Sequence, residues 1–347
     1  MRRGLTLLEM MVAFAVFISL MFTLVGISSL VLDSWTRGET RKDTADRAES
    51  VLSIIENDLK SLFAERETPW VGPENTRTYL LGAHLHCDLD KWNRPVLKFV
   101  RTGGRDEMQL RPPDLSARVP PTDMYADLFE VMYMFRDGAG EATLYRGAQY
   151  FNRNDRTRSF YTAPRIDPNA FKPVDDGVLF LELRYWDPQT DRWDAQDTRN
   201  VPAGRRGNDA SLRWDSSRAT GPVFPYYRRN QSVADPDYVY PEMIRVRIIL
   251  KSRALDARKV FLLDDVNEST VTLRVSTTRD IPDPPGAIRI DGEWIEYGRK
   301  DFSTIYASKR GAWGTAKAAH SMRSDVGFGD EYTRVVYLPL RMEAVRR

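Results

Sequence analysis

Glu9 has the most unusual chemical setting in this sequence. It is the only charged residue between Leu5 and Leu32, in a run of otherwise apolar, small and hydroxyl-bearing side chains. A carboxylate at the centre of a bilayer costs about 2.5 to 3.5 kcal/mol on insertion scales, so such a residue usually has a partner or a function. The sequence therefore predicts a specific role for Glu9.

Potential metal ligands lie in segment 84–90, which reads HLHCDLD. Alternate residues of a β-strand share one face, and here that face would carry His84, His86, Asp88 and Asp90. Imidazole and carboxylate ligands suit zinc. The intervening residues are apolar, however, so the same alternation describes a strand with one solvent-facing side, which is the interpretation we favour.

A second acidic group lies in the segment LDDVNE, where Asp264, Asp265 and Glu268 could supply oxygen ligands to calcium. The segment lacks the ligand spacing of a known calcium loop, and we interpret it as a solvent-exposed turn. No phosphate-binding loop, dinucleotide fingerprint, paired zinc cysteines or nucleophile elbow occurs in the sequence. We therefore expect neither an enzyme nor a bound cofactor.

Composition places the chain among ordinary folded proteins. It has 347 residues, 42% of them hydrophobic and 29% charged, which is enough for one large domain or two with a sizeable core. The net charge of +2 equals the contribution of Arg2 and Arg3, so the remainder is neutral and does not favour nucleic-acid binding. A single cysteine, Cys87, excludes an internal disulfide framework.

The N-terminal apolar run predicts a membrane-spanning helix. Leu5–Leu32 comprises 28 residues, and a helix of that length rises roughly 42 Å, enough to cross a hydrocarbon core of about 30 Å. Arg2 and Arg3 precede it, so the positive-inside rule places the N-terminus in the cytoplasm. A cleaved secretory signal would have a shorter apolar core. A plain signal anchor explains everything except Glu9.

The stretch Gly4–Ala13, GLTLLEMMVA, resembles the leader and mature start of type IV prepilins. In that family a short basic leader ends in glycine, a membrane aspartyl peptidase cuts after it, and the fifth mature residue is glutamate. The resemblance implies cleavage between Gly4 and Leu5, N-methylation of Leu5, and a role for Glu9 in filament assembly. The first mature residue is commonly Phe, so Leu5 is a departure from the family pattern.

This resemblance agrees with a simple charge argument. Cleavage before Leu5 creates an α-ammonium group one helical turn from Glu9. In a helical assembly, each Glu9 can neutralise the N-terminal ammonium of a neighbouring subunit inside an apolar bundle. The alternative is a glutamate at the membrane interface whose carboxylate reaches water.

Beyond the apolar run, residues 33–64 predict an amphipathic continuation of the helix. Apolar residues recur at three- and four-residue spacing: Ala48, Val51, Leu52, Ile55, Leu59, Leu62 and Phe63. We expect the charged residues between them to form a solvated face: Arg41, Lys42, Asp43, Asp46, Arg47, Glu49, Glu56, Asp58 and Lys60. No proline precedes Pro69, so one helix from about Leu5 to Ala64 is predicted, and its C-terminal half should pack on a sheet.

Alternating segments then predict β-strands at 96–101, 131–135, 142–146, 179–186 and 244–250, with 335–338 as a final strand. They predict one half-buried antiparallel sheet with a face available to the helix, and hence an α+β fold with a helical spine. We assign residues 65–260 to this β domain, with a long polar loop at 187–240. Five aromatics near the end of that loop could form a contact surface, but we favour their interpretation as anchors of the loop: Phe224, Tyr226, Tyr227, Tyr238 and Tyr240.

Residues 261–333 are interpreted as an inserted β-module, followed by the final strand and tail at 334–347. Asp291-Gly292 lies between two apolar segments, which predicts a hairpin. The stretch from Ile290 to Ser321 is similar to a small β-unit that recurs in phage-tail and surface proteins, a resemblance that implies no activity.

The order of elements resembles that of J-type minor pseudopilins of type II secretion systems and W-type minor pilins. The resemblance implies an inner-membrane protein with a periplasmic globular domain, assembled at or near the tip of a pseudopilus that supports protein export. Its implied partners are the prepilin peptidase, other minor and major pseudopilins or pilins, and the inner-membrane assembly platform. The alternatives are a minor pilin of a type IV pilus, serving adhesion, motility or DNA uptake, and a membrane-anchored binding protein that never polymerises.

Overall fold

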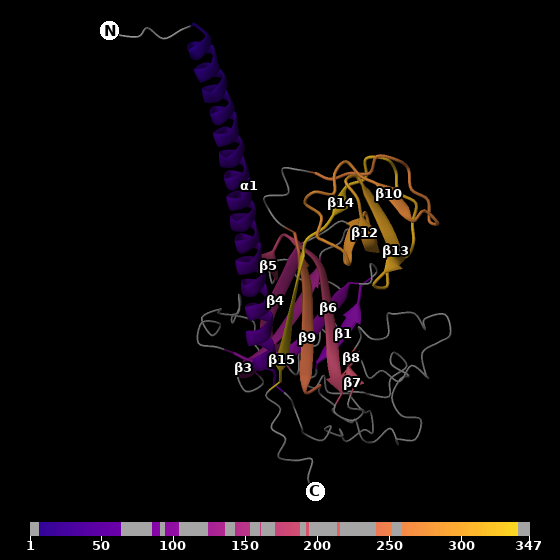
Figure 1. Cartoon of the computed structure of the whole chain (residues 1–347). Helices are drawn as coiled ribbons and strands as arrows, with labels where there is room; N and C mark the ends of the chain where they lie inside the picture. Colours follow the sequence, from indigo (N-terminus) through magenta and orange to yellow (C-terminus); the bar gives the residue numbers. More distant parts are fainter. Residues whose placement is uncertain are drawn as a thin grey trace, which may run out of the picture.

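The computed structural model describes residues 7–63, 85–90, 94–103, 124–135, 143–152, 160, 171–187, 192–193, 214–215, 241–251 and 259–338. These residues form one long helix and three antiparallel sheets (Figure 1). The predicted α+β class is therefore confirmed. Most of the predicted loop 187–240, including its five aromatics, lies outside the described residues.

Helix α1 runs without interruption from Leu7 to Lys60, 54 residues in all. At 1.5 Å per residue it is roughly 81 Å long. It ends earlier than the predicted Ala64, because the chain turns at Ser61 and then adopts a strand-like path. Leu62 bridges Arg101, and the Phe63 amide donates to the Val100 carbonyl at 2.9 Å.

The first sheet has six strands in the order β5-β4-β3-β2-β1-β8. Its strands are β1 (His86–Leu89), β2 (Pro95–Thr102), β3 (Met124–Phe135), β4 (Leu144–Asn152), β5 (Phe171–Asp175) and β8 (Trp214–Asp215). The second and third predicted strand segments form a hairpin, since β3 and β4 pair antiparallel up to Phe135 and Leu144.

The second sheet has four strands in the order β15-β9-β6-β7. Its strands are β6 (Val178–Asp187), β7 (Arg192–Trp193), β9 (Met243–Leu250) and β15 (Asp330–Tyr337). The prediction of one sheet is therefore wrong. β6 is also not half-buried as predicted, because Leu181 and Leu183 join the main core while Leu179 and Phe180 are buried on the opposite face.

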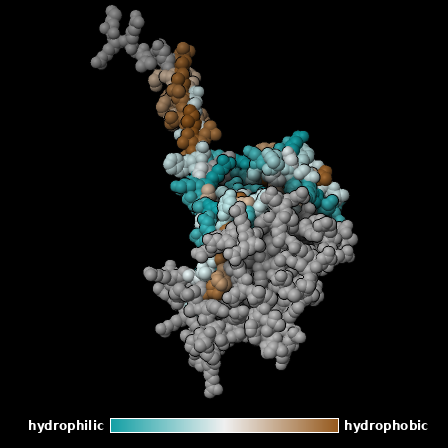
Figure 2. Space-filling view, turned by 90° about the horizontal axis from the view of Figure 1, so that it is seen from below, coloured by the Kyte–Doolittle hydropathy of each residue, from teal (hydrophilic) through white to brown (hydrophobic). Residues whose placement is uncertain are grey.

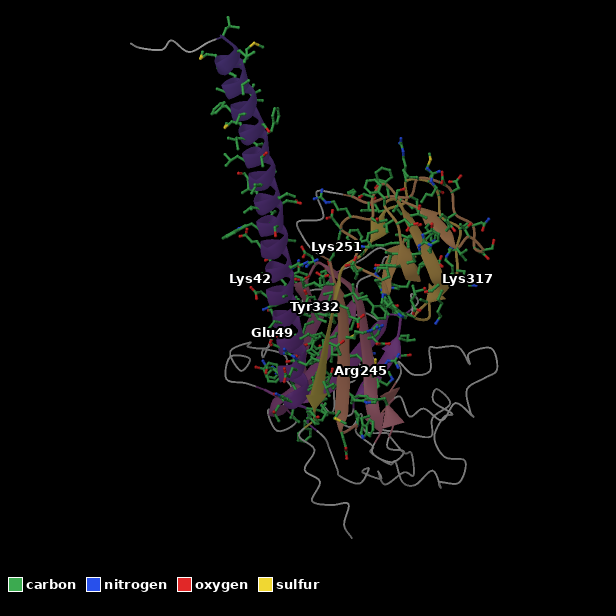
Figure 3. All side chains as sticks on the ribbon, in the orientation of Figure 1. Lys42, Glu49, Arg245, Lys251, Lys317 and Tyr332 are labelled. Carbon is green, nitrogen blue, oxygen red and sulfur yellow. The ribbon has the colours of Figure 1, made fainter. Side chains whose placement is uncertain are left out.

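The main core lies between the two sheets and the C-terminal half of α1. Ala48, Val51, Leu52, Ile55 and Leu59 supply the helical side of this core, as the apolar spacing predicts. The strands supply residues from both sheets: Leu97, Phe99, Val131, Tyr133, Leu144, Leu181, Leu183, Ile244, Val246, Ile248 and Val336. Figure 3 shows side chains filling the space between this half of α1 and the strands, whereas those of the other half project outward.

Residues 259–329 include a separate five-stranded sheet, ordered β10-β13-β12-β11-β14. Its strands are β10 (Thr272–Arg274), β11 (Gly286–Ile290), β12 (Glu293–Lys300), β13 (Thr304–Ala312) and β14 (Val326–Gly327). We call residues 259–329 the module; it has its own apolar core, which includes Ile288, Ile290, Ile295 and Tyr297. The predicted hairpin at Asp291-Gly292 is confirmed by the pairing of Ile290 with Glu293.

The module is inserted between two strands that are neighbours in the second sheet. β15 begins at Asp330, ahead of the predicted residue 334, and Asp330 pairs with Leu250 at the end of β9. The module packs on the outer face of β6 and β9. There Phe180 lies against Trp313, with ring centroids 4.4 Å apart, and Trp313 lies against Trp294 at 4.6 Å.

Candidate functional site

The N-terminal half of α1 is an uncovered apolar surface. Figure 1 shows it projecting from the folded domains, and in Figure 2 it is the largest hydrophobic surface in view. Its large apolar side chains between Leu7 and Trp35 are all exposed, from 46% at Met21 to 79% at Leu7. This helix is long and apolar enough to cross a membrane, consistent with a single-pass anchor. Such a surface requires lipid or other apolar helices to cover it.

Two of the hydroxyl-bearing side chains within this half make local hydrogen bonds to the helix backbone. The hydroxyls of Thr23 and Ser29 donate to the carbonyls of Ser19 and Val25, at 2.9 and 2.8 Å. Such bonds let hydroxyl-bearing residues enter an apolar environment without leaving an unpaired donor. The hydroxyls are therefore compatible with a membrane or a helical bundle.

The predicted processing residues lie at the edge of the described structure. Gly4 and Leu5 fall outside the described residues, and Glu9 lies in the first turn of α1. The cleavage position, the methylation of Leu5 and the role of Glu9 therefore stay predictions.

The apolar half ends where the module reaches the helix. Asp33 is the first charged residue after Glu9, and its carboxylate pairs with Arg279 of the module at 2.5 Å. Both side chains are substantially exposed, so the pair contributes little to stability. It marks the level along α1 at which the folded domains begin.

The C-terminal half of α1 is fixed by a buried ionic cluster around Asp58. This side chain is only 4% exposed and pairs with Arg101 at 2.9 Å and with Arg146 at 2.6 Å. The Tyr133 hydroxyl also donates to Asp58. Burial and then the nearby Asp58 carboxylate raise the pKa of Tyr133 well above its ordinary value, so the phenol stays protonated. The prediction that Asp58 belongs to a solvated face is wrong.

Ion pairs of two further arginines, Arg47 and Arg334, attach the helix to the strands. Arg47, also predicted to be solvated, is largely buried and pairs with Asp175 of β5 at 2.6 Å. Its guanidinium also donates to the carbonyl of Lys251, where the chain leaves β9 for the module (Figure 3). On the other side, Arg334 of β15 contacts Glu56 at 2.8 Å and also pairs with Glu49. The projecting half therefore continues, without a linker, into a firmly held half.

The potential metal ligands of segment 84–90 do not form a cluster within the part of the chain that the structure describes. His84 lies outside that part, Cys87 is fully buried, and Asp90 pairs with Arg94 at 2.8 Å. In the acidic segment LDDVNE, Asp264 pairs with Arg274 at 3.1 Å and Asp265 accepts a hydrogen bond from the Met322 amide at 2.7 Å. Arg274 and Met322 therefore engage these two carboxylates in a turn.

A buried polar cluster in the module was not predicted. The Glu293 carboxylate accepts two hydrogen bonds from Arg310, at 2.7 and 2.8 Å, and lies 2.8 Å from Nε2 of His320. It also accepts the amides of Gly311 and Ala318. Nδ1 of His320 contacts Asp291 at 2.9 Å. The sequence offers no signal for this cluster, because its members are separated by up to 29 residues.

Burial alone would raise the pKa of Glu293, but the hydrogen bonds from Arg310, the Ala318 amide, His320 and the Gly311 amide lower it to about 2. A carboxylate held in this way connects β12, β13 and the loop that ends at His320.

No protein-family model matches the chain, and no curated protein is significantly similar to it.

Proposed function

We propose that this chain is a minor pilin-like subunit, cleaved between Gly4 and Leu5 and assembled at or near the tip of a type II secretion pseudopilus. The observation that carries the proposal is the continuity of α1. An exposed apolar half with one carboxylate, Glu9, passes directly into a half that is locked into the folded domain. Packing several such apolar halves together would cover their surfaces and leave the folded domains outside the bundle.

In this function Glu9 is an assembly residue. Removal of the leader by the prepilin peptidase exposes an ammonium group on Leu5, and the Glu9 carboxylate of an adjacent subunit neutralises it within the apolar bundle. The partners are other minor and major pseudopilins and the inner-membrane assembly platform. The folded domain lies on the periplasmic side, as the basic residues Arg2 and Arg3 favour.

The absence of a linker distinguishes this proposal from a simple anchor. A membrane-anchored binding protein functions equally well with a flexible connection between its span and its domain. In this chain the span and the domain share one helix, with buried ion pairs at Asp58 and Arg47. A rigid connection of this kind suits a subunit whose domain must be positioned relative to its neighbours.

The first test is the intact mass and N-terminal sequence of the protein recovered from its native membrane. The expected N-terminus is Leu5, with or without an added methyl group. A matched variant, Gly4→Val, should retain the leader and start at Met1, because a branched side chain before the cut obstructs the peptidase. A wild-type protein that starts at Met1 would contradict processing and leave only a membrane-anchored domain.

A further inference from the structure

A cleft of about 360 Å³ lies between the module and the adjoining ends of β2, β3 and β6 in the two main sheets. This volume falls in the range of small-molecule binding sites, which often lie between domains. Its walls include four large aromatic side chains, which come from both sides of the cleft: Phe135 at the end of β3, Phe180 of β6, Trp294 of β12, and Trp313 after β13. Two arginines, Arg94 and Arg289, also line it.

Arg289 is placed in the cleft by strand alternation. Its neighbours Ile288 and Ile290 enter the core of the module, so the Arg289 side chain lies on the opposite face of β11. There it is only 7% exposed. Within the part of the chain that the structure describes, its one hydrogen bond runs from Nη1 to the Leu179 carbonyl and is long at 3.4 Å.

This guanidinium has no counter-charge among the residues described. Ion pairs are present for Arg94, with Asp90, and for Arg310, with Glu293, but no described carboxylate lies within ion-pair distance of Arg289. A guanidinium has five N–H donors, and the residues described accept from only one nitrogen of Arg289. Burying an ion without a partner is costly, because the ion loses its hydration and gains no opposite charge in return.

The other charged groups of the cleft do not compensate Arg289. Arg94 is itself positive, and its guanidinium lies 5.1 Å from the ring centre of Phe135. Burial and then the positive charge of Arg94 lower the pKa of Arg289 to about 10. The two acidic groups of the lining, Asp291 and Glu293, both contact His320 instead. The lining of the cleft therefore includes two arginines together with apolar and aromatic side chains.

We propose that this cleft binds a small organic carboxylate. The carboxylate group accepts hydrogen bonds from Arg289 and Arg94, which a guanidinium provides in a fork that matches both oxygens. The apolar part of the ligand packs against Phe180, Trp294 and Trp313. This site is independent of filament assembly, because it lies in the folded domains rather than on the projecting helix.

The test uses the full-length protein in an uncharged detergent and two probes of the same shape, sodium benzoate and benzamide. Binding is followed by tryptophan fluorescence and by calorimetry. We expect saturable binding of benzoate, and at least about tenfold weaker binding of benzamide, because only benzoate carries the charge. Equal affinity for the two probes, or no saturable binding of benzoate, would overturn the proposal without any need for a variant.

Two arginine variants locate the site. Arg289→Met keeps the length of the side chain but removes the charge, and we expect at least about tenfold weaker benzoate binding together with a higher unfolding temperature. Arg274→Met is the matched control, since Arg274 is an exposed arginine of the same module outside the cleft, and it should bind benzoate normally. Unchanged benzoate binding in Arg289→Met would exclude this cleft as the site.

Discussion

At the scale of single residues, the charged groups that matter most are those buried with partners distant in sequence. Asp58 connects α1 to β2, β3 and β4 through Arg101, Tyr133 and Arg146. Glu293 similarly connects β12 and β13 within the module. Each carboxylate is almost fully enclosed, so its stabilising contribution depends on the whole set of partners remaining in place.

Replacing Asp58 should therefore be severely destabilising. In Asp58→Ala, Arg101 and Arg146 would be left buried without their shared carboxylate, and we expect a loss of about 3 to 5 kcal/mol in the free energy of unfolding. Thermal or urea unfolding in detergent, followed by near-ultraviolet circular dichroism, measures this loss. Asp46→Ala is the matched control, because Asp46 is an exposed aspartate on the same helix, and it should change stability by less than about 0.5 kcal/mol.

Glu293 should make the module sensitive to acid. The pKa of Glu293 is lowered from 4.5 in the unfolded chain to about 2 in the folded protein. The unfolded chain therefore takes up the proton first, and the contribution of Glu293, about 3 kcal/mol, is present above pH 4.5 and is lost as the pH falls toward 2. Unfolding temperatures measured across this pH range should fall more steeply for the wild type than for Glu293→Gln.

The comparison also has a clear opposing outcome. Glu293→Gln should be less stable than the wild type at pH 7, because Arg310 and His320 lose their charged partner. Parallel pH profiles for the two proteins, offset by a constant difference, would show that Glu293 does not titrate as described.

At the scale of elements, α1 has two halves that require different tests. The Asp58→Ala variant tests how the folded half is held, and the Glu9→Ala variant tests the role of the projecting half. Glu9→Ala should still insert into the membrane and still be cleaved after Gly4, since removing a charge does not weaken insertion. We expect it to lose incorporation into filaments, measured by cross-linking to neighbouring pilin-like subunits in the native membrane.

A substitution elsewhere on the projecting half provides the control for Glu9. Ser28→Ala removes only a hydroxyl from the same apolar run and should leave cross-linking unchanged. If Glu9→Ala cross-links and functions as well as Ser28→Ala does, a membrane-anchored protein that never polymerises becomes the better explanation.

Helix α1 and several of the strands could be predicted because their signals are local. The spacing of Val51, Ile55 and Leu59 identifies the buried stripe of α1. The dipeptide Asp291-Gly292 identifies the hairpin formed by β11 and β12. The errors concern partners from distant segments. Asp58 looks solvated in the sequence because its arginines lie 43 and 88 residues away. The split into two sheets was missed because alternation shows which face of a strand is apolar, not which strands pair. Likewise, the burial of Arg289 could not be predicted, because in the sequence it looks like any polar residue between two isoleucines on a half-exposed strand.

At the scale of the whole molecule, the module is an insertion that leaves the pairing of β9 with β15 in the main domain intact. Its two ends lie side by side, since Leu250 pairs with both Val178 of β6 and Asp330 of β15. β9 and β15 would thus be an ordinary hairpin without it, and adjacent ends are what allow a domain to be inserted without disturbing its host.

Replacing residues 252–329 by an Asn-Gly turn should therefore preserve the main domain. We expect hydrogen-exchange protection of α1 and β9 to persist, and the newly uncovered Leu179, Phe180 and Ile249 to reduce solubility. A companion variant with Phe180→Ser should recover solubility. Loss of protection throughout α1 and β9 would show that the module is required for the main fold.

The attachment of α1 also has a mechanical consequence. If the chain is pulled along its projecting half, the force acts parallel to the axis of α1. The contacts of Arg47, Asp58 and Arg334 are distributed along the same axis. They would resist in shear and would have to fail together rather than one after another. A membrane span continuous with such a helix transmits force directly into the folded domain, with no slack to absorb it.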